Sequence, residues 1–324
     1  MKQTIKFIAG MLLAASLVSE AHAQETYPDR VVSVIVPFPP GGVAEQTGRP
    51  ALQALSKQLK QPFVLLNKPG AGGSIGAATV ANAKPDGYTL LLALASVSTN
   101  PEADRIAGRP VAFELDQLAP IALLTADPVI LMVRADSPYQ SLKDLVDDAK
   151  KRPGDINYSS SGNYGTYHVA TEMFTNAAAI KMRHIPYQGG GPALLALLSG
   201  EVNVGLLGPS VAAAQIKAGK LRPLASWGAT RIAVLPDLPT LKELGYDVEY
   251  AIWSGLFAPV NTPAAVMTAL RDGVRAITQD TEFQASMAKL ETPINYLDAP
   301  AFKTFWATDA KRLIETVRKI GKIE

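Results

Sequence analysis

Cysteine is absent from the 324-residue chain, so no disulfide bond can form and no N-terminal cysteine can carry a lipid. Histidine is nearly as scarce, and only His168 and His184 lie beyond residue 23. They are 16 residues apart, which matches no common spacing of metal ligands. The composition argues against a disulfide-stabilised scaffold and against a zinc site, and we expect no bound metal.

An excess of charge of either sign is also missing. The chain has 31 basic and 29 acidic residues, a net charge of +2. Nucleic-acid and membrane-surface partners favour a basic excess. No strand-to-helix turn carries G-x-G-x-x-G or a Walker lysine, the motifs that hold nucleotide phosphates. We therefore expect neither a nucleic-acid partner nor a cofactor.

Long apolar runs are lacking except near the N-terminus. Residues 7–18 are apolar, but about 12 residues are too few for a spanning helix, which needs roughly 20. Lys2 and Lys6 precede this run and Ala21-His22-Ala23 follows it, the three parts of a secretory signal peptide. We expect cleavage before Gln24 and an exported, untethered protein, for which the periplasm is the expected compartment.

Buried strands alternate with helices along the rest of the chain. The pattern predicts strands at 31–36, 63–66, 88–94, 129–133, 157–159, 182–185, 202–207, 221–227 and 253–258. Helices are expected after Pro39-Pro40-Gly41-Gly42 and at 74–83, 142–150, 167–178, 193–199, 211–218 and through most of 263–321. One sheet of so many strands would be large, so we expect two α/β lobes with a cleft between them. The crossing segments are expected near 121–133 and 246–257.

Four of the predicted strands end in loops of small residues, at 37–42, 95–100, 159–166 and 184–191. In open α/β sheets, ligands bind at the carboxyl ends of strands. Glycines let the backbone approach a ligand, hydroxyls supply donors, and the free N–H groups of a helix start favour an anion. Any one such loop could be an ordinary turn. Four at equivalent positions favour a site for a small carboxylate that needs no Arg or Lys.

Several side chains could add selectivity to this site. Glu45 lies four residues before Arg49, a spacing at which the two side chains meet on a helix. The pair could be purely structural, or Glu45 could face the cleft and select a cationic or hydroxyl group. Tyr164 and Tyr187 lie within the loops and could stack on a planar ligand, although aromatic residues more often serve as walls.

A serine hydrolase is one alternative, because residues 72–76 match G-x-S-x-G with Ser74 at the centre. In such enzymes the serine directly follows a strand. Here residues 67–71 separate it from the preceding strand, and only His168 and His184 could serve as base. The absence of a convincing nucleophile and base favours a binding protein.

A series of motifs along the chain resembles those of a known protein family. They are Tyr27-Pro28-Asp29-Arg30, Val36 to Gly42, Asn67 to Gly73, Pro85 to Leu90, Ser161-Gly162 with His168, His184 to Gly189, Pro239-Thr240 with Glu243, Gly245-Tyr246, and Leu256 to Pro259. In this order they resemble the substrate-binding proteins of tripartite tricarboxylate transporters, also called the Bug or TctC family. The match extends along nearly the whole mature chain.

The resemblance implies a two-lobed flytrap, the periplasmic binding protein fold, with two strands crossing between lobes. We place lobe 1 at 24–126 and 250–324 and lobe 2 at 127–249. It implies a monomer that captures a di- or tricarboxylate, an amino acid or an aromatic acid and delivers it to the membrane subunits of a transporter. A sensor for a signalling system would use the same cleft and stays open as an alternative.

Carried over to this chain, the resemblance implies that the ligand is held by Phe38, Pro40, Gly41, Gly42, Ser96, Ser98, Ser161, Asn163, Thr166, Tyr187 and Gly189. Two further residues depart from the family pattern. Glu45 replaces the usual aspartate, which puts recognition of an amino-acid amine in doubt. Tyr164 replaces a smaller residue, and we expect it to narrow the cleft or to stack on a flat acid.

Overall fold

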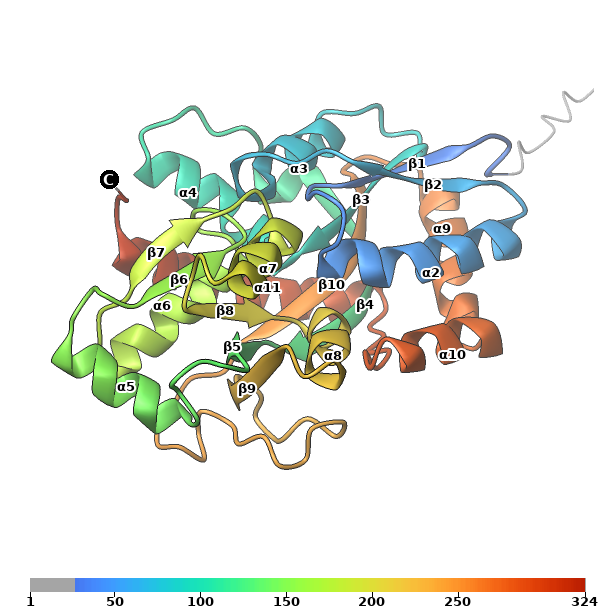
Figure 1. Ribbon diagram of the computed structural model, residues 1–324. Coiled ribbons are helices and arrows are strands. Elements are labelled where there is room, and N and C mark those ends of the chain that lie inside the picture. Colours follow the sequence, from blue (N-terminus) through green and yellow to red (C-terminus); the bar gives the residue numbers. More distant parts are fainter. Residues whose placement is uncertain (1–26, 324) are drawn as a thin grey trace, which may run out of the picture.

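The computed structural model describes residues 27–323, which fold around two five-stranded sheets (Figure 1). The predicted signal peptide and its cleavage site lie outside the described residues. Among residues 27–323, no helix combines the length and the apolar character needed to cross a bilayer. The two-lobed α/β fold expected from the sequence is confirmed.

The first sheet combines the two ends of the described chain. Its strands, in spatial order, are β2 (Phe63–Asn67), β1 (Val32–Val36), β3 (Thr89–Leu94), β10 (Ala251–Pro259) and β4 (Leu118–Pro128). Strands β1, β2 and β3 are parallel, whereas β10 runs antiparallel to both β3 and β4. We call this sheet and the helices that cover it lobe 1.

The second sheet is built from the middle of the chain and repeats the same plan. Its strands, in spatial order, are β7 (Arg183–Pro186), β6 (Asn157–Ser160), β8 (Val204–Leu207), β5 (Ile130–Arg134) and β9 (Leu221–Ser226). Strands β6, β7 and β8 are parallel and β5 is antiparallel to both neighbours. We call this sheet and its helices lobe 2. The residue boundaries of the lobes given above stay a prediction.

Helices connect the strands and cover the sheets. Those of lobe 1 are α2 (Val43–Leu59), α3 (Ser74–Ala81), α4 (Asn100–Ile106), α9 (Ala264–Ile277), α10 (Thr281–Lys289) and α11 (Ala299–Ile320). Those of lobe 2 are α5 (Leu142–Lys151), α6 (Thr166–Ala178), α7 (Gly190–Ser199) and α8 (Pro209–Lys217). The sequence pattern missed α4, because its seven residues contain Pro101 and three charges and show no apolar stripe.

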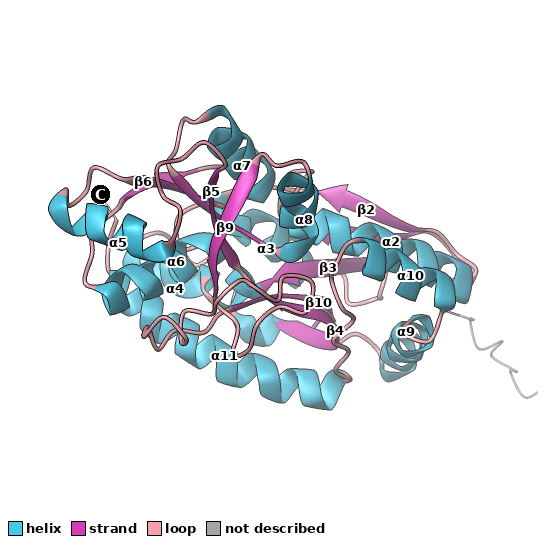
Figure 2. Cartoon of the chain, turned by 60° about the horizontal axis from the view of Figure 1, so that its bottom comes forward, coloured by secondary structure: helices cyan, strands magenta, loops and turns pink. Residues whose placement is uncertain are grey.

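The longest helix, α11, runs alongside β4 and β10 (Figure 2). Phe302 and Trp306 of this helix pack against Trp253 and Phe257 of β10 with ring centroids 4.8–5.7 Å apart. Gly255 lies beneath the Phe302 ring, where a side-chain carbon would come within 2.4 Å of it. Aromatic pairs of this kind contribute about 0.5–1.5 kcal/mol each beyond their buried area, so α11 is held firmly on lobe 1.

Two neighbouring segments connect the lobes. β4 ends at Pro128 and β5 begins at Ile130, so the first crossing is made at Val129. The returning segment is bonded to it, because Trp227 N–H donates to Val129 O and Tyr250 N–H donates to Trp227 O, both at 3.0 Å. β10 and β4 then pair from Ala251 with Pro128 onward. The lobes are therefore joined by a hinge that is itself hydrogen-bonded.

Asp127 lies within this hinge, opposite Ile252 in the β4–β10 pair. Only 3% of its surface is exposed, although it carries an ionisable group. Burial raises the pKa of its carboxyl to about 7. Because the folded protein holds this proton more tightly than the unfolded chain, stability falls as pH rises from about 4 to about 7.

We predict that Asp127→Asn stabilises the protein more at pH 8 than at pH 5. The amide stays neutral, so the advantage of the variant should grow by about 2–3 kcal/mol over that interval. Denaturant unfolding of the wild type and the variant at both pH values measures it. Asp237→Asn, at an exposed position, serves as the control. An advantage of Asp127→Asn that does not change with pH would contradict the buried, high-pKa carboxyl.

Candidate functional site

The starts of helices from the two lobes face each other across the cleft. α2 begins after Gly42 in lobe 1, and α7 begins after Gly189 in lobe 2. A side-chain carbon at Gly42 would lie 3.8 Å from the Gly191 N atom, and one at Gly41 would lie 3.7 Å from the Gly191 Cα. Gly41 also has a φ of +88°, which side chains disfavour. Small residues here allow the backbones of the two lobes to approach.

A third helix start joins these two. α8 begins after Gly208, where a side-chain carbon would come within 2.6 Å of Val43 Cγ2 at the start of α2. Each helix start carries roughly half a positive charge together with unpaired N–H groups. Three of them brought together repel one another unless an anion lies between them. The arrangement is therefore suited to an anionic ligand held by backbone donors.

Buried hydroxyls without a hydrogen-bond partner occur at the same strand ends. Within the described part of the chain, Ser96, Thr166, Ser210 and Tyr250 each have such an oxygen, and each residue is at most 8% exposed. A buried polar group without a partner costs about 1–3 kcal/mol. Four of them in the loops and in the hinge indicate a place where a polar ligand or water supplies the missing bonds.

Tyr250 links this cluster to the hinge. Its hydroxyl lies near that of Thr166, at the start of α6, and near Tyr167. Burial raises the pKa of Tyr250 above its ordinary value, so the phenol stays protonated and can donate. The Tyr167 hydroxyl accepts from Gly208 N–H at 3.2 Å and so fixes the start of α8. These tyrosines shape the floor of the site with uncharged groups.

A pocket of about 490 Å³ opens at the edge of the cleft. Four of the predicted site residues line it: Phe38, Ser161, Asn163 and Tyr187. Lobe 1 also contributes Asn100, from the predicted loop 95–100, and the segment Gly70–Gly73, which the sequence analysis did not select. The only basic side chain in the lining, Arg109, is paired with Asp104 at 2.8 Å. A ligand here meets mainly neutral groups.

The predicted site residues differ in whether their polar groups are free or already hydrogen-bonded within the protein. Pro40, Gly41, Gly42 and Gly189 lie where the lobes touch, and Ser96 and Thr166 have free hydroxyls. Ser98, by contrast, accepts from the Trp306 indole N–H at 3.0 Å. Its hydroxyl is used to hold α11. Its place two residues after Ser96 in the sequence gives no sign of this difference.

Glu45 makes the pair with Arg49 that the spacing predicts. Its other carboxylate oxygen accepts from Gly41 N–H at 2.6 Å. Burial raises the pKa of Glu45, but the bonds from Gly41 and Arg49 outweigh burial and hold the pKa below its ordinary value. Glu45 thus fixes the loop before α2 and occupies one of its donors. Its selectivity toward a ligand stays a prediction.

Tyr164 points away from the pocket that its neighbour Asn163 lines. Its hydroxyl donates to Gly321 O at 2.8 Å and accepts from Ile323 N–H at 3.1 Å. Its backbone carbonyl accepts from Thr99 Oγ1 at 2.9 Å. In this position Tyr164 joins lobe 2 to two parts of lobe 1. The geometry gives no support to its expected stacking on a flat acid.

The hydrolase alternative requires a histidine beside Ser74, and none is there. Ser74 Oγ lies 3.4 Å from Asp104 Oδ2. His168 and His184 instead stack on each other in lobe 2, 3.9 Å apart, and His184 Nε2 lies 2.6 Å from Ser160 Oγ. Burial lowers the pKa of His184 to about 4. Across residues 27–323, no group of His, Cys, Asp and Glu side chains could hold a metal ion.

Ser210 and Tyr250 are two further site residues that the sequence analysis missed. Ser210 follows Gly208-Pro209 at the end of β8, and the same reasoning about strand ends could have found it. Tyr250 precedes β10 after a long irregular segment and carries no such signal.

Comparison with known proteins identifies the family and supports the fold. Residues 48–322, most of the chain, match the model of the tripartite tricarboxylate transporter family receptor. The structure of the periplasmic binding protein BugD is 31% identical, with a TM-score of 0.84 over 90% of this chain and 98% of that one. Two structures from Rhodopseudomonas palustris are also similar. Rpa4515 with adipate is 27% identical to this chain, with a TM-score of 0.84 over 90% of this chain and 98% of Rpa4515. MatC with bound malate is 26% identical, with a TM-score of 0.81 over 90% of this chain and 100% of MatC.

We predict that Tyr164→Phe loosens the contact between the lobes. The change removes two hydrogen bonds and should cost about 1–3 kcal/mol of unfolding free energy. It should also raise the radius of gyration measured by small-angle X-ray scattering.

Tyr139→Phe provides the matched control, because Tyr139 donates to Asp148 within lobe 2. It should lower stability without changing the scattering. Equal scattering of the two variants would show that Tyr164 does not hold the lobes together.

Proposed function

Because the chain belongs to the tripartite tricarboxylate transporter receptor family, we propose that it captures a small carboxylate between its lobes in the periplasm. The loaded protein would then deliver this ligand to the membrane subunits of a transporter. The unpaired donors in the cleft fit a binding function. Among the described residues, no histidine lies beside Ser74, as a serine hydrolase would require.

The convergence of three helix starts from both lobes is the observation that carries the proposal. It brings together the starts of α2, α7 and α8, after Gly42, Gly189 and Gly208, each with a favourable dipole for a negative charge. Ser96, Thr166, Ser210 and Tyr250 add four hydroxyl donors. A carboxylate accepts at about four lone-pair positions and can use several of these donors, whereas an ammonium group can accept no hydrogen bond.

Donors on both lobes favour a ligand with a carboxylate at each end. A diacid could bond to lobe 1 with one end and to lobe 2 with the other, so closure would add contacts that a monoacid lacks. The adipate and malate named for the two Rhodopseudomonas palustris structures are acids of this kind. We therefore rank aliphatic diacids first, ahead of amino acids and aromatic acids.

A thermal-shift panel tests the class of ligand. Succinate, malate, glutarate, adipate, citrate, aspartate, benzoate and putrescine would each be added to the wild-type protein. A ligand at 100 times its dissociation constant stabilises by about 2.7 kcal/mol, which is roughly 5–10 °C for a chain of this size. We expect the largest shift with a diacid. A shift with putrescine and none with any acid would refute the proposal.

A neighbouring pair of serines tests the site. We predict that Ser96→Ala weakens the binding of the best acid roughly tenfold while leaving the free protein as stable as the wild type, because its hydroxyl has no partner to lose. Ser98→Ala should do the reverse, since it leaves the Trp306 N–H without an acceptor and costs about 1–3 kcal/mol of stability. Calorimetric titration and denaturant unfolding of both variants give the two readouts. Unchanged affinity in Ser96→Ala would remove Ser96 from the site.

A change at Gly42 tests the role of the facing helix starts. Gly42→Asp places a tethered carboxylate beside the Gly190 and Gly191 N–H groups and should abolish the thermal shift without unfolding the protein. Gly42→Ala has room for its methyl group and should keep the shift. Binding that survives in Gly42→Asp would mean that the ligand does not use these helix starts.

A further inference from the structure

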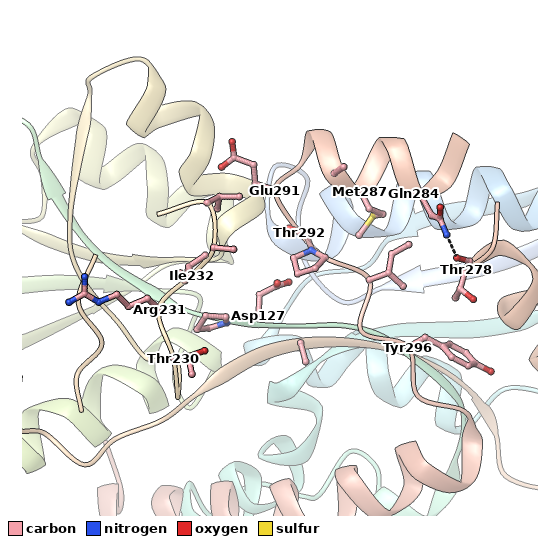
Figure 3. Close-up of a pocket in the computed structure, with 18 of the residues that line it drawn as sticks. Asp127, Thr230, Arg231, Ile232, Thr278, Gln284, Met287, Glu291, Thr292 and Tyr296 are labelled. Atoms are coloured by element: carbon pink, nitrogen blue, oxygen red, sulfur yellow. Dashed lines mark hydrogen bonds between the residues drawn. The ribbon is translucent and has the colours of Figure 1, made fainter. Parts of the chain in front are cut away.

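A second cavity, of about 830 Å³, lies at the hinge and shares no lining residue with the cleft pocket. One wall is the segment 228–234, which follows β9 in lobe 2. The other wall comes from lobe 1, where the end of α9, the helix α10 and residues 291–296 line it (Figure 3). The floor is the hinge strand at residues 126–128.

The walls of this hinge cavity are largely apolar. Ile232 and Val234 project from lobe 2, and Met287, Ala288 and Ile294 come from lobe 1. The polar Gln284 is already bonded, since its amide donates to Thr278 O at 2.8 Å. Surfaces of this kind suit the hydrocarbon part of a small organic molecule.

Asp127 is the exception in this apolar setting. It is 3% exposed, and Figure 3 shows its carboxylate between Ile232 of lobe 2 and Thr292 of lobe 1. Among residues 27–323, no hydrogen-bond donor or cation reaches this carboxylate within bonding distance. A buried charge without a partner is strongly unfavourable, so a donor that enters the cavity would gain a strong bond.

The other charged groups around the cavity are already neutralised. Arg231 is paired with Glu243 at 2.9 Å, and Glu291 is paired with Lys217. Tyr296 is the remaining titratable side chain in the lining. The cavity therefore presents one carboxyl without a partner at its floor, which is negatively charged above about pH 7, and an occupant with one positive charge would balance it.

We propose that the hinge cavity binds a small organic ammonium ion. The N–H groups of the ammonium donate to the Asp127 carboxylate, and its alkyl chain packs on Ile232, Met287 and Ile294. A metal ion is a poor alternative, because a single carboxylate supplies too few ligands and the described residues form no metal-binding group. The proposal is independent of the carboxylate site, since neither the donors proposed for that site nor the residues of the cleft pocket line the hinge cavity.

Binding of n-pentylamine, which is protonated near neutral pH, tests this site by calorimetric titration of the full mature protein. Pentanol and pentanoate serve as the neutral and anionic analogues. We expect pentylammonium to bind about tenfold more tightly than either, the effect of one charge-assisted hydrogen bond. Binding should tighten from pH 5.5 to pH 8, because the pKa of Asp127 is raised to about 7 and its carboxyl ionises over this interval.

Two variants and a control complete the test. Asp127→Asn should weaken pentylammonium binding about tenfold and remove its pH dependence. Ala288→Trp, which fills the cavity from the exposed side of α10, should block binding and leaves Asp127 unchanged. Asp237→Asn should bind as the wild type does. Equal binding of pentylammonium and pentanoate, binding that survives in both variants, or no binding of pentylammonium would overturn the proposal.

Discussion

The approach of helix starts from opposite lobes is the constraint on which the rest of this structure depends. Backbones can come this close only where side chains are absent, at Gly41, Gly42, Gly189 and Gly208. The same closeness collects unpaired N–H groups and helix dipoles of one sign in a small volume. The contact between the lobes and the proposed affinity for an anion thus have a common physical cause. A site built in this way needs no arginine or lysine, in agreement with the balanced charge of the chain.

The hinge is the second element on which this arrangement depends. Strands β4 and β10 pair along their length, and the bonds between Trp227, Val129 and Tyr250 continue the contact across the gap between sheets. The lobes are therefore held in register at the hinge. Tyr250 places its hydroxyl among the site residues, and Asp127 places its carboxyl in a different cavity. The hinge contributes to both proposed sites as well as to the connection between lobes.

Much of the fold could be predicted from local patterns. Buried parallel strands are continuous apolar runs, and those at β1, β3 and β8 are found where the sequence predicts them. The Glu45–Arg49 pair also follows from spacing alone, because residues four apart meet on any helix. The bond from Glu45 to Gly41 depends on the turn before the helix, and the position of Tyr164 depends on a C-terminal segment 157 residues away. Spacing along the chain carries no information about either contact.

By itself, the sequence determined the class of this protein: two α/β lobes, small-residue loops at strand ends, and membership of a receptor family. These properties depend on the periodicity of apolar residues, on the positions of glycines and on the order of short motifs along the chain. All three can be read from the sequence without knowing which distant residues are in contact. Only the tertiary structure decided which hydroxyls are free. Ser96 and Ser98 are equivalent in the sequence, but α11, more than 200 residues later, brings the Trp306 indole to one of them and leaves the other without a partner. The same holds for Asp127, whose high pKa arises because distant segments of both lobes remove it from water.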